Sequence, residues 1–67
     1  MNWPDEVNAS TRALVERVCT EAEVEVLKLK ARGWGRRRIA RMLAISDTAV
    51  RDRIRNAQRK LEREVDG

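Results

Sequence analysis

The 67-residue chain contains no histidine, tyrosine or phenylalanine, and its aromatic residues are Trp3 and Trp34. Its single cysteine, Cys19, has no partner for an intramolecular disulfide and cannot build a cysteine-based metal cage. Without histidine, and without a glycine-rich phosphate loop, the sequence offers no acid–base pair or nucleophile of the kind that enzymes use. These absences argue against an enzyme, and we expect neither a metal ion nor a cofactor.

Long apolar segments are lacking as well. No stretch approaches the roughly 20 apolar residues that a membrane-spanning helix needs, and the sequence shows no secretory signal. The sequence therefore predicts a cytoplasmic protein that does not enter a membrane. At this length we expect one domain over residues 1–67, with a core that is only marginally sufficient.

Charged residues make up 39% of the chain, which favours helices with solvated faces over sheets. The net charge of +4 is uneven, because residues 1–24 carry −3 and residues 25–67 carry +7. This asymmetry indicates a polyanion on one side and solvent or a protein partner on the other. Twelve of the fifteen cations are arginine, which suits phosphate and guanine. A GC-rich genome is an equally good explanation of the preference for arginine over lysine. It does not explain why the cations are concentrated in residues 25–67.

The first third of the chain predicts little regular structure before a short helix. Residues 1–9 are expected to be weakly ordered, although Pro4 followed by two acidic residues is also compatible with the start of a short helix. Residues 10–18 predict a short helix with Leu14 and Val18 on its apolar side.

Thr20 and Glu23 form a capping-box pattern, which predicts a helix that runs to about Arg32 and ends at Gly33. This helix has two apolar faces and is therefore expected to be sandwiched, with the last two helices on one side and the 10–18 helix or a partner protein on the other. The first face consists of Val24, Leu27 and Ala31, and the second of Ala22, Val26 and Leu29. Glu25, Lys28 and Lys30 remain for solvent, and Trp34 is expected to fill the core.

Residues 36–43 and 47–64 predict two helices that a short turn joins, as in a helix-turn-helix. A small residue at Ala40 allows a close helix crossing, Ala44 suits a tight turn, and Val50 buries the crossing point. Ser46 is placed to cap the second helix through its hydroxyl. Residues 19–64 thus form the expected helix-turn-helix core of an all-α bundle of about four helices.

The last helix divides into two faces that suit a recognition helix. An apolar stripe for the core consists of Val50, Ile54, Ala57 and Leu61. A major groove about 12 Å wide admits one α-helix, whose first half reaches the base edges. The residues expected to contact bases are Asp47, Thr48, Arg51, Asp52 and Arg55. Asp52 is equally compatible with accepting from a cytosine amino group and with an ion pair that orients Arg51 or Arg55.

A second set of polar residues is expected to contact the phosphates that flank the groove. This set consists of Arg36, Arg37, Arg38, Arg41, Ser46 and Arg59. The alternative for the Arg36–Arg38 triplet is a solvated helix start without a ligand, and we favour phosphate contact.

Three segments resemble a known family: residues 20–27 (TEAEVEVL), 39–46 (IARMLAIS) and 48–51 (TAVR). They are similar to the region-four domain of bacterial sigma factors, over about residues 19–61, and also to the LuxR-type domain of response regulators. Gly33 fits the LuxR-type pattern, whereas residues 50–61 resemble the sigma pattern, with apolar residues at 54, 57 and 61. LuxR-type domains usually carry a further short dimerisation helix, for which residues 62–67 are too short and too polar, so we favour region four. Ala44 replaces the glycine of many members, and the chain lacks a sigma region two.

The resemblance implies a helix-turn-helix that reads promoter DNA and that docks on RNA polymerase. We therefore expect a sequence-selective DNA-binding transcriptional regulator whose recognition helix, about residues 47–64, enters the major groove. The alternative is an adaptor that binds RNA polymerase or a sigma factor through the same fold, with weak or no DNA contact. A homodimer is a further option, because a monomer reads only a few base pairs.

Overall fold

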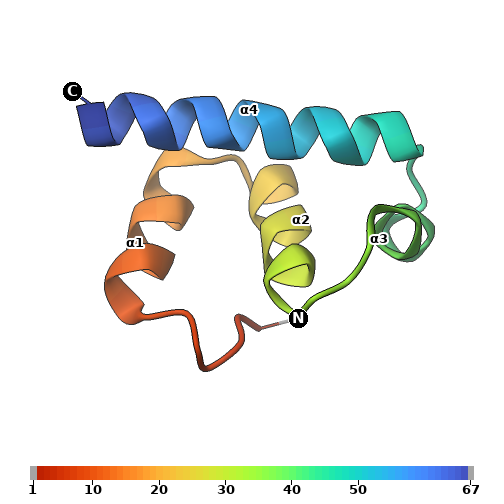
Figure 1. The fold of residues 1–67 in the computed structure, drawn as a ribbon, viewed down its shortest axis with the longest axis horizontal. Helices are drawn as coiled ribbons and strands as arrows, with labels where there is room; N and C mark the ends of the chain where they lie inside the picture. The colour runs from red at the N-terminus through yellow and green to blue at the C-terminus, as the bar shows by residue number, and fades with distance from the viewer. Residues whose placement is uncertain (1, 67) are drawn as a thin grey trace.

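The computed structural model of the chain describes residues 2–66, which contain four α-helices. These are α1 (Ala9–Val18), α2 (Glu21–Ala31), α3 (Arg36–Leu43) and α4 (Asp47–Asp66). Figure 1 shows α4 along one side of the molecule, with α1 and α2 lying across it and α3 beside its first turn. The predicted all-α class, with about four helices that end in a helix-turn-helix, is confirmed.

The start and end of α2 follow from local hydrogen bonds. The Glu23 N–H donates to Thr20 Oγ1 over 3.2 Å, and the Thr20 N–H donates to Glu23 Oε1 over 2.9 Å, so the predicted capping box is present. Gly33 lies at φ 90°, a conformation that glycine adopts without a steric cost. The Trp34 N–H then donates to the Leu29 carbonyl over 3.2 Å, which ends α2 with a left-handed turn.

The turn between α3 and α4 is equally well defined. Ala44 adopts a left-handed conformation at φ 55°, and the Ile45 N–H donates to the Ala40 carbonyl over 2.9 Å. The Ala49 N–H donates to Ser46 Oγ over 3.0 Å, so Ser46 caps α4 as the sequence predicts. These two features fix the direction in which α4 leaves α3.

The core lies where α2, α3 and α4 meet. Its buried members are Val26, Leu29, Ile39, Ala40 and Val50, and Trp34, Leu43, Ile45 and Ile54 pack against them. The predicted stripe of α4 is confirmed in direction, with Val50 and Ala57 fully buried and Ile54 and Leu61 half-buried. The apolar faces of α2 are narrower than predicted, because Ala22 and Ala31 are exposed.

The apolar side of α1 differs from the prediction. Val15 is its buried residue, with 5% of its surface exposed, whereas Leu14 and Val18 are half-buried. In this ten-residue helix, apolar and polar residues are interspersed, so the sequence does not define one apolar side. Its packing partners therefore determine which side is buried. Here α1 packs on both α2 and α4, and Val15 is the α1 residue that becomes buried.

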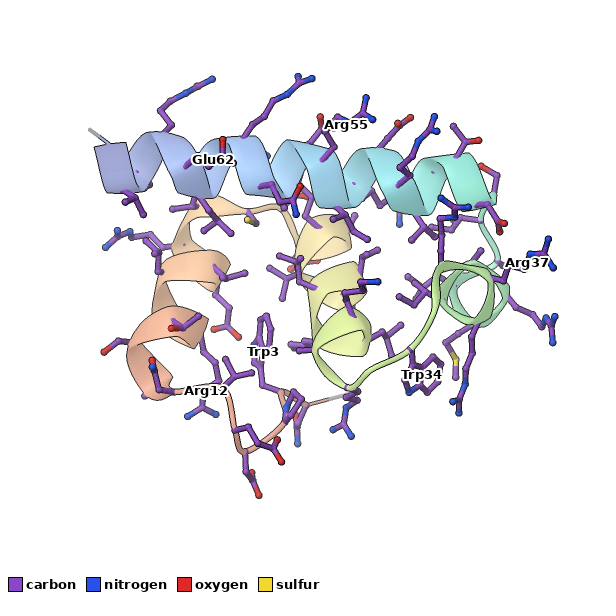
Figure 2. All side chains as sticks on the ribbon, viewed as in Figure 1. Trp3, Arg12, Trp34, Arg37, Arg55 and Glu62 are labelled. Carbon is purple, nitrogen blue, oxygen red and sulfur yellow. The ribbon has the colours of Figure 1, made fainter. Side chains whose placement is uncertain are left out.

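The residues before α1 make contacts that the sequence does not indicate. The Val7 N–H donates to the Pro4 carbonyl over 3.1 Å, so Pro4 lies in a turn and does not begin a helix. The Trp3 Nε1–H donates to Glu16 Oε1 over 2.9 Å, and Lys28 Nζ lies 5.9 Å from the centre of the Trp3 ring. Figure 2 shows Trp3 in the space between α1 and α2.

Candidate nucleic-acid interface

The outer side of α4 carries four of the five residues predicted to contact bases. Thr48, Arg51, Asp52 and Arg55 are all exposed, as is Arg59 farther along the helix. Figure 2 shows Arg55 pointing away from α1 and α2. The helix is therefore anchored along one side by its apolar stripe and open along the other. An anchored helix with an open polar side is the arrangement that docking into a groove requires.

The fifth residue, Asp47, is half-buried and lies at the first position of α4. Arg37 Nε lies 3.9 Å from Asp47 Oδ2, with the two side chains 90% and 45% exposed. A surface ion pair of this kind contributes at most about 1 kcal/mol, so both side chains remain free to change partner. Asp47, predicted to contact a base, and Arg37, predicted to contact a phosphate, are thus paired with each other across the α3–α4 turn.

The remaining arginines of α3 are exposed, but they differ in their surroundings. Among the described side chains, Arg36 and Arg41 make no cation–π contact with an aromatic ring, whereas the Arg38 guanidinium lies 3.8 Å from the centre of the Trp34 ring. Trp34 packs against the core, as predicted, so it provides a fixed surface for this stacking. Stacking occupies one face of the guanidinium and leaves its in-plane N–H donors for an anion.

A hollow of about 310 Å³ lies between α4 and the facing parts of α2 and α3. We call it the basic hollow; its lining residues are Lys30, Arg36, Arg51, Ile54, Arg55 and Gln58. The sequence places Lys30 in solvent, and it is exposed, but the sequence gives no sign that it shares a hollow with three arginines. Such a grouping depends on three helices at once and has no signature in residue spacing.

A buried ion pair joins α2 to α4. Lys60 Nζ donates to both carboxylate oxygens of Glu23, over 2.8 and 3.1 Å, and Glu23 is only 6% exposed. Burial alone would raise the pKa of Glu23. The hydrogen bonds from Lys60 and Thr20, together with the Lys60 charge, outweigh that effect and hold the pKa below its ordinary value. Glu23 therefore stays ionised and ties the start of α2 to the second half of α4.

The sequence predicts Glu23 as part of the capping box, and its link to Lys60 was not predicted. The two residues lie 37 positions apart, so no local spacing connects them. One feature of the sequence could have indicated the pair: Lys60 directly precedes Leu61, a member of the apolar stripe of the last helix. A charged group at the edge of such a stripe needs a partner once the helix packs.

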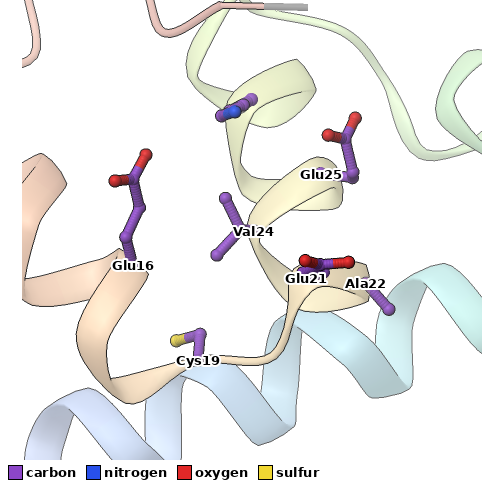
Figure 3. A pocket seen from close by; sticks show the side chains of 7 residues that line it. Glu16, Cys19, Glu21, Ala22, Val24 and Glu25 are labelled. Carbon is purple, nitrogen blue, oxygen red and sulfur yellow. The ribbon is translucent and has the colours of Figure 1, made fainter.

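A second hollow, separate from the basic one, is lined by three glutamates. This hollow of about 600 Å³ between α1 and α2, which we call the acidic hollow, is lined by Glu16, Cys19, Glu21, Ala22, Val24, Glu25 and Lys28. Figure 3 shows Val24 pointing from α2 toward α1, which carries Glu16, while Glu21 and Glu25 extend from α2 itself. Burial first, and the Glu23 charge second, raise the pKa of the Cys19 thiol, which favours its protonated form.

Among the side chains described for residues 2–65, no three of His, Cys, Asp or Glu come together as a metal site would require. No helix among residues 2–66 combines the length and the apolar character needed to cross a membrane.

Comparison with known proteins gives a family match over most of the chain. Residues 17–64 match the family described as bacterial regulatory proteins, luxR family. Comparison with curated proteins gives no match, and comparison with solved structures gives none either. The family match supports the LuxR-type resemblance, and it lends no support to the sigma region four that the sequence led us to favour.

Proposed function

The chain belongs to the luxR family of bacterial regulatory proteins, and from this premise we propose that it is a sequence-selective DNA-binding transcriptional regulator. In this proposal α4 enters the major groove with its outer side toward the bases. The observation that carries the proposal is the exposed row of Thr48, Arg51, Asp52 and Arg55 on a helix whose other side is buried. A duplex major groove has the width to accept one such helix.

The side chains of this row match the chemistry of base edges. Arg51 and Arg55 each present a planar fork that fits the two acceptors of guanine, and the Thr48 methyl suits a thymine methyl. Asp52 has two roles open to it, namely accepting from a cytosine amino group or orienting a neighbouring arginine. Asp47 begins this row but is paired with Arg37, so its contact with a base requires that pair to open.

Phosphate contacts come from the residues around this row. We propose them for Arg36, Arg37, Arg38, Arg41, Ser46 and Arg59, which are all exposed. Contacts of this kind fix the register of the protein on the duplex without reading its sequence. Arg38 is the most constrained of the set, because its stacking on Trp34 orients the guanidinium before DNA arrives.

The proposal is tested by selecting bound sequences from random DNA and then replacing Arg51 or Arg55 by alanine. Each replacement is expected to weaken binding to the selected sequence by about 1–3 kcal/mol, because a bidentate contact to guanine is lost. Binding to unrelated DNA should change much less. The measurement is the ratio of the two dissociation constants, obtained by fluorescence anisotropy.

Arg63→Ala is the matched control, since it removes the same charge from the last part of α4. Its ratio of specific to non-specific binding should equal that of the wild type. If the Arg51 and Arg55 variants also keep the wild-type ratio, α4 does not read bases through this row and the assignment fails.

A protein-binding role is the second candidate, and the acidic hollow is the observation that favours it. The glutamates of this hollow lie between α1 and α2, whereas the proposed DNA-binding row lies on α4. An adaptor for RNA polymerase or a sigma factor would use the former surface and would tolerate loss of Arg51 and Arg55. A pull-down of purified RNA polymerase with the Arg51→Ala/Arg55→Ala double variant separates the two roles.

A further inference from the structure

The basic hollow brings cations from three helices to one place. Lys30 comes from the last turn of α2, Arg36 from the first residue of α3, and Arg51 and Arg55 from successive turns of α4. Helical side chains lean toward the N-terminus of their helix, and the N-terminus of α2 lies at α4. Lys30 therefore leans toward α4, which accounts for its place in the hollow.

Among the described side chains, the cations of the basic hollow have a carboxylate only beside it: Asp47 lines an adjoining hollow with Arg36 and Arg51, and it pairs with Arg37. No carboxylate belongs to the lining of the basic hollow itself. Among the side chains that the structure describes, none of these four cations takes part in an ion pair, whereas Lys60, Arg17 and Arg37 each have one. Like charges at close range repel each other, and an anion in the hollow removes that repulsion. A surface that gathers unpaired cations around a cavity is suited to a phosphate.

We propose that the basic hollow holds a phosphate of the DNA backbone and that Lys30 is a phosphate contact from α2. This inference rests on the proposed function, and it adds α2 to a surface that sequence analysis confined to α3 and α4. Arg51 and Arg55 belong both to the hollow and to the base-reading row. A strand whose bases meet that row therefore passes its backbone over the hollow.

The position of Lys30 relative to α4 is fixed by the rest of the fold. The Glu23–Lys60 pair ties the start of α2 to α4, and Leu29, next to Lys30, is 1% exposed in the shared core. The backbone that carries Lys30 thus moves with the recognition helix as one unit. A contact from such a fixed position aids the register of α4 in the groove as well as its affinity.

The test compares Lys30→Gln with Lys28→Gln on a random-sequence DNA duplex, because backbone contacts do not depend on sequence. Lys28 is the matched control: it lies on the same helix, but it lines the acidic hollow and faces Trp3. Each phosphate contact contributes about −0.9 to the slope of log affinity against log salt. When the salt concentration rises from about 50 to about 200 mM, the affinity of each protein for DNA falls. The factor by which it falls should be about 3.5 times smaller for Lys30→Gln than for the wild type.

Lys28→Gln is expected to keep the wild-type slope, and Lys30→Arg should keep it as well. Equal slopes for Lys30→Gln and the wild type would overturn the proposal while leaving DNA binding itself intact. A wild type that binds no duplex at all would refute the proposed function and this inference with it. Tight binding of inorganic pyrophosphate that Lys30→Gln abolishes, with an unchanged DNA slope, would assign the hollow to a free phosphate ligand and overturn the duplex assignment.

Discussion

Replacing Leu29 by alanine is expected to unfold a large share of the protein. Leu29 is 1% exposed and lies at the centre of the core that α2, α3 and α4 share. Removing a buried leucine side chain to the β-carbon costs about 2–5 kcal/mol, with the larger values where the cavity cannot collapse. A chain of this length holds a total of about 3–10 kcal/mol against unfolding. The variant should therefore show a much lower melting temperature by circular dichroism.

Two further variants, at an exposed and at a half-buried position, serve as comparisons for Leu29→Ala. Met42→Ala removes a similar volume from a side chain that is 55% exposed, and it should melt close to the wild type. Ile54→Ala should fall between the two, because Ile54 is half-buried against the core. A Leu29→Ala variant that melts with Met42→Ala would mean that α2 does not pack as the structure describes.

Features set by neighbouring residues were the ones that the sequence predicted well. The Thr20–Glu23 capping box, the end of α2 at Gly33 and the Ser46 cap each depend on groups within a few positions of one another. The stripe of α4 follows from helical periodicity over a long segment, so Val50 and Ala57 were placed correctly in the interior. Capping residues that lie close together, and a helical period of apolar residues over many turns, can both be recognised in a single sequence.

Features set by packing between distant segments were missed. The orientation of α1 about Val15, the contacts of Trp3 and the Glu23–Lys60 pair each join residues that the chain order keeps apart. The basic hollow belongs to the same class, because Lys30 joins it only after α2 packs against α4. The site was therefore predicted on α3 and α4, and its proposed extension onto α2 needed the fold.

The preference for sigma region four has a related physical cause. The segments that carry the resemblance, including the capping box and the turn after Ala40, are similar to both families. The choice then depended on the apolar positions 54, 57 and 61, which resemble the sigma pattern, and on residues 62–67, which are too short and too polar for the further helix of LuxR-type domains. In the structure α4 continues to Asp66 without a break, so the last residues extend the recognition helix. The family match over residues 17–64 decided what the core residues could not.

The second large effect concerns Glu23. Replacing Glu23 by alanine should lower the free energy of unfolding by about 3 kcal/mol. This value is at the lower end for a broken buried ion pair, because Lys60 is about one-third exposed and can turn toward water. Glu23→Ala also removes the acceptor for the Thr20 N–H, whereas Glu23→Gln keeps an oxygen there and loses the charge. Comparing the two variants by urea unfolding at neutral pH separates the ion pair from the capping box.

The pH dependence gives this prediction a specific sign. The folded state holds the pKa of Glu23 below its ordinary value of 4.5, so the unfolded chain takes up the proton first as the pH falls. The stabilisation by the Glu23 charge is then complete above about pH 4.5 and is lost as the pH falls toward the lower, folded pKa. The difference in unfolding free energy between the wild type and Glu23→Gln should stay constant from neutral pH down to that point and then shrink. A difference that stays the same in acid would show that the Glu23 carboxylate is not what holds α2 to α4.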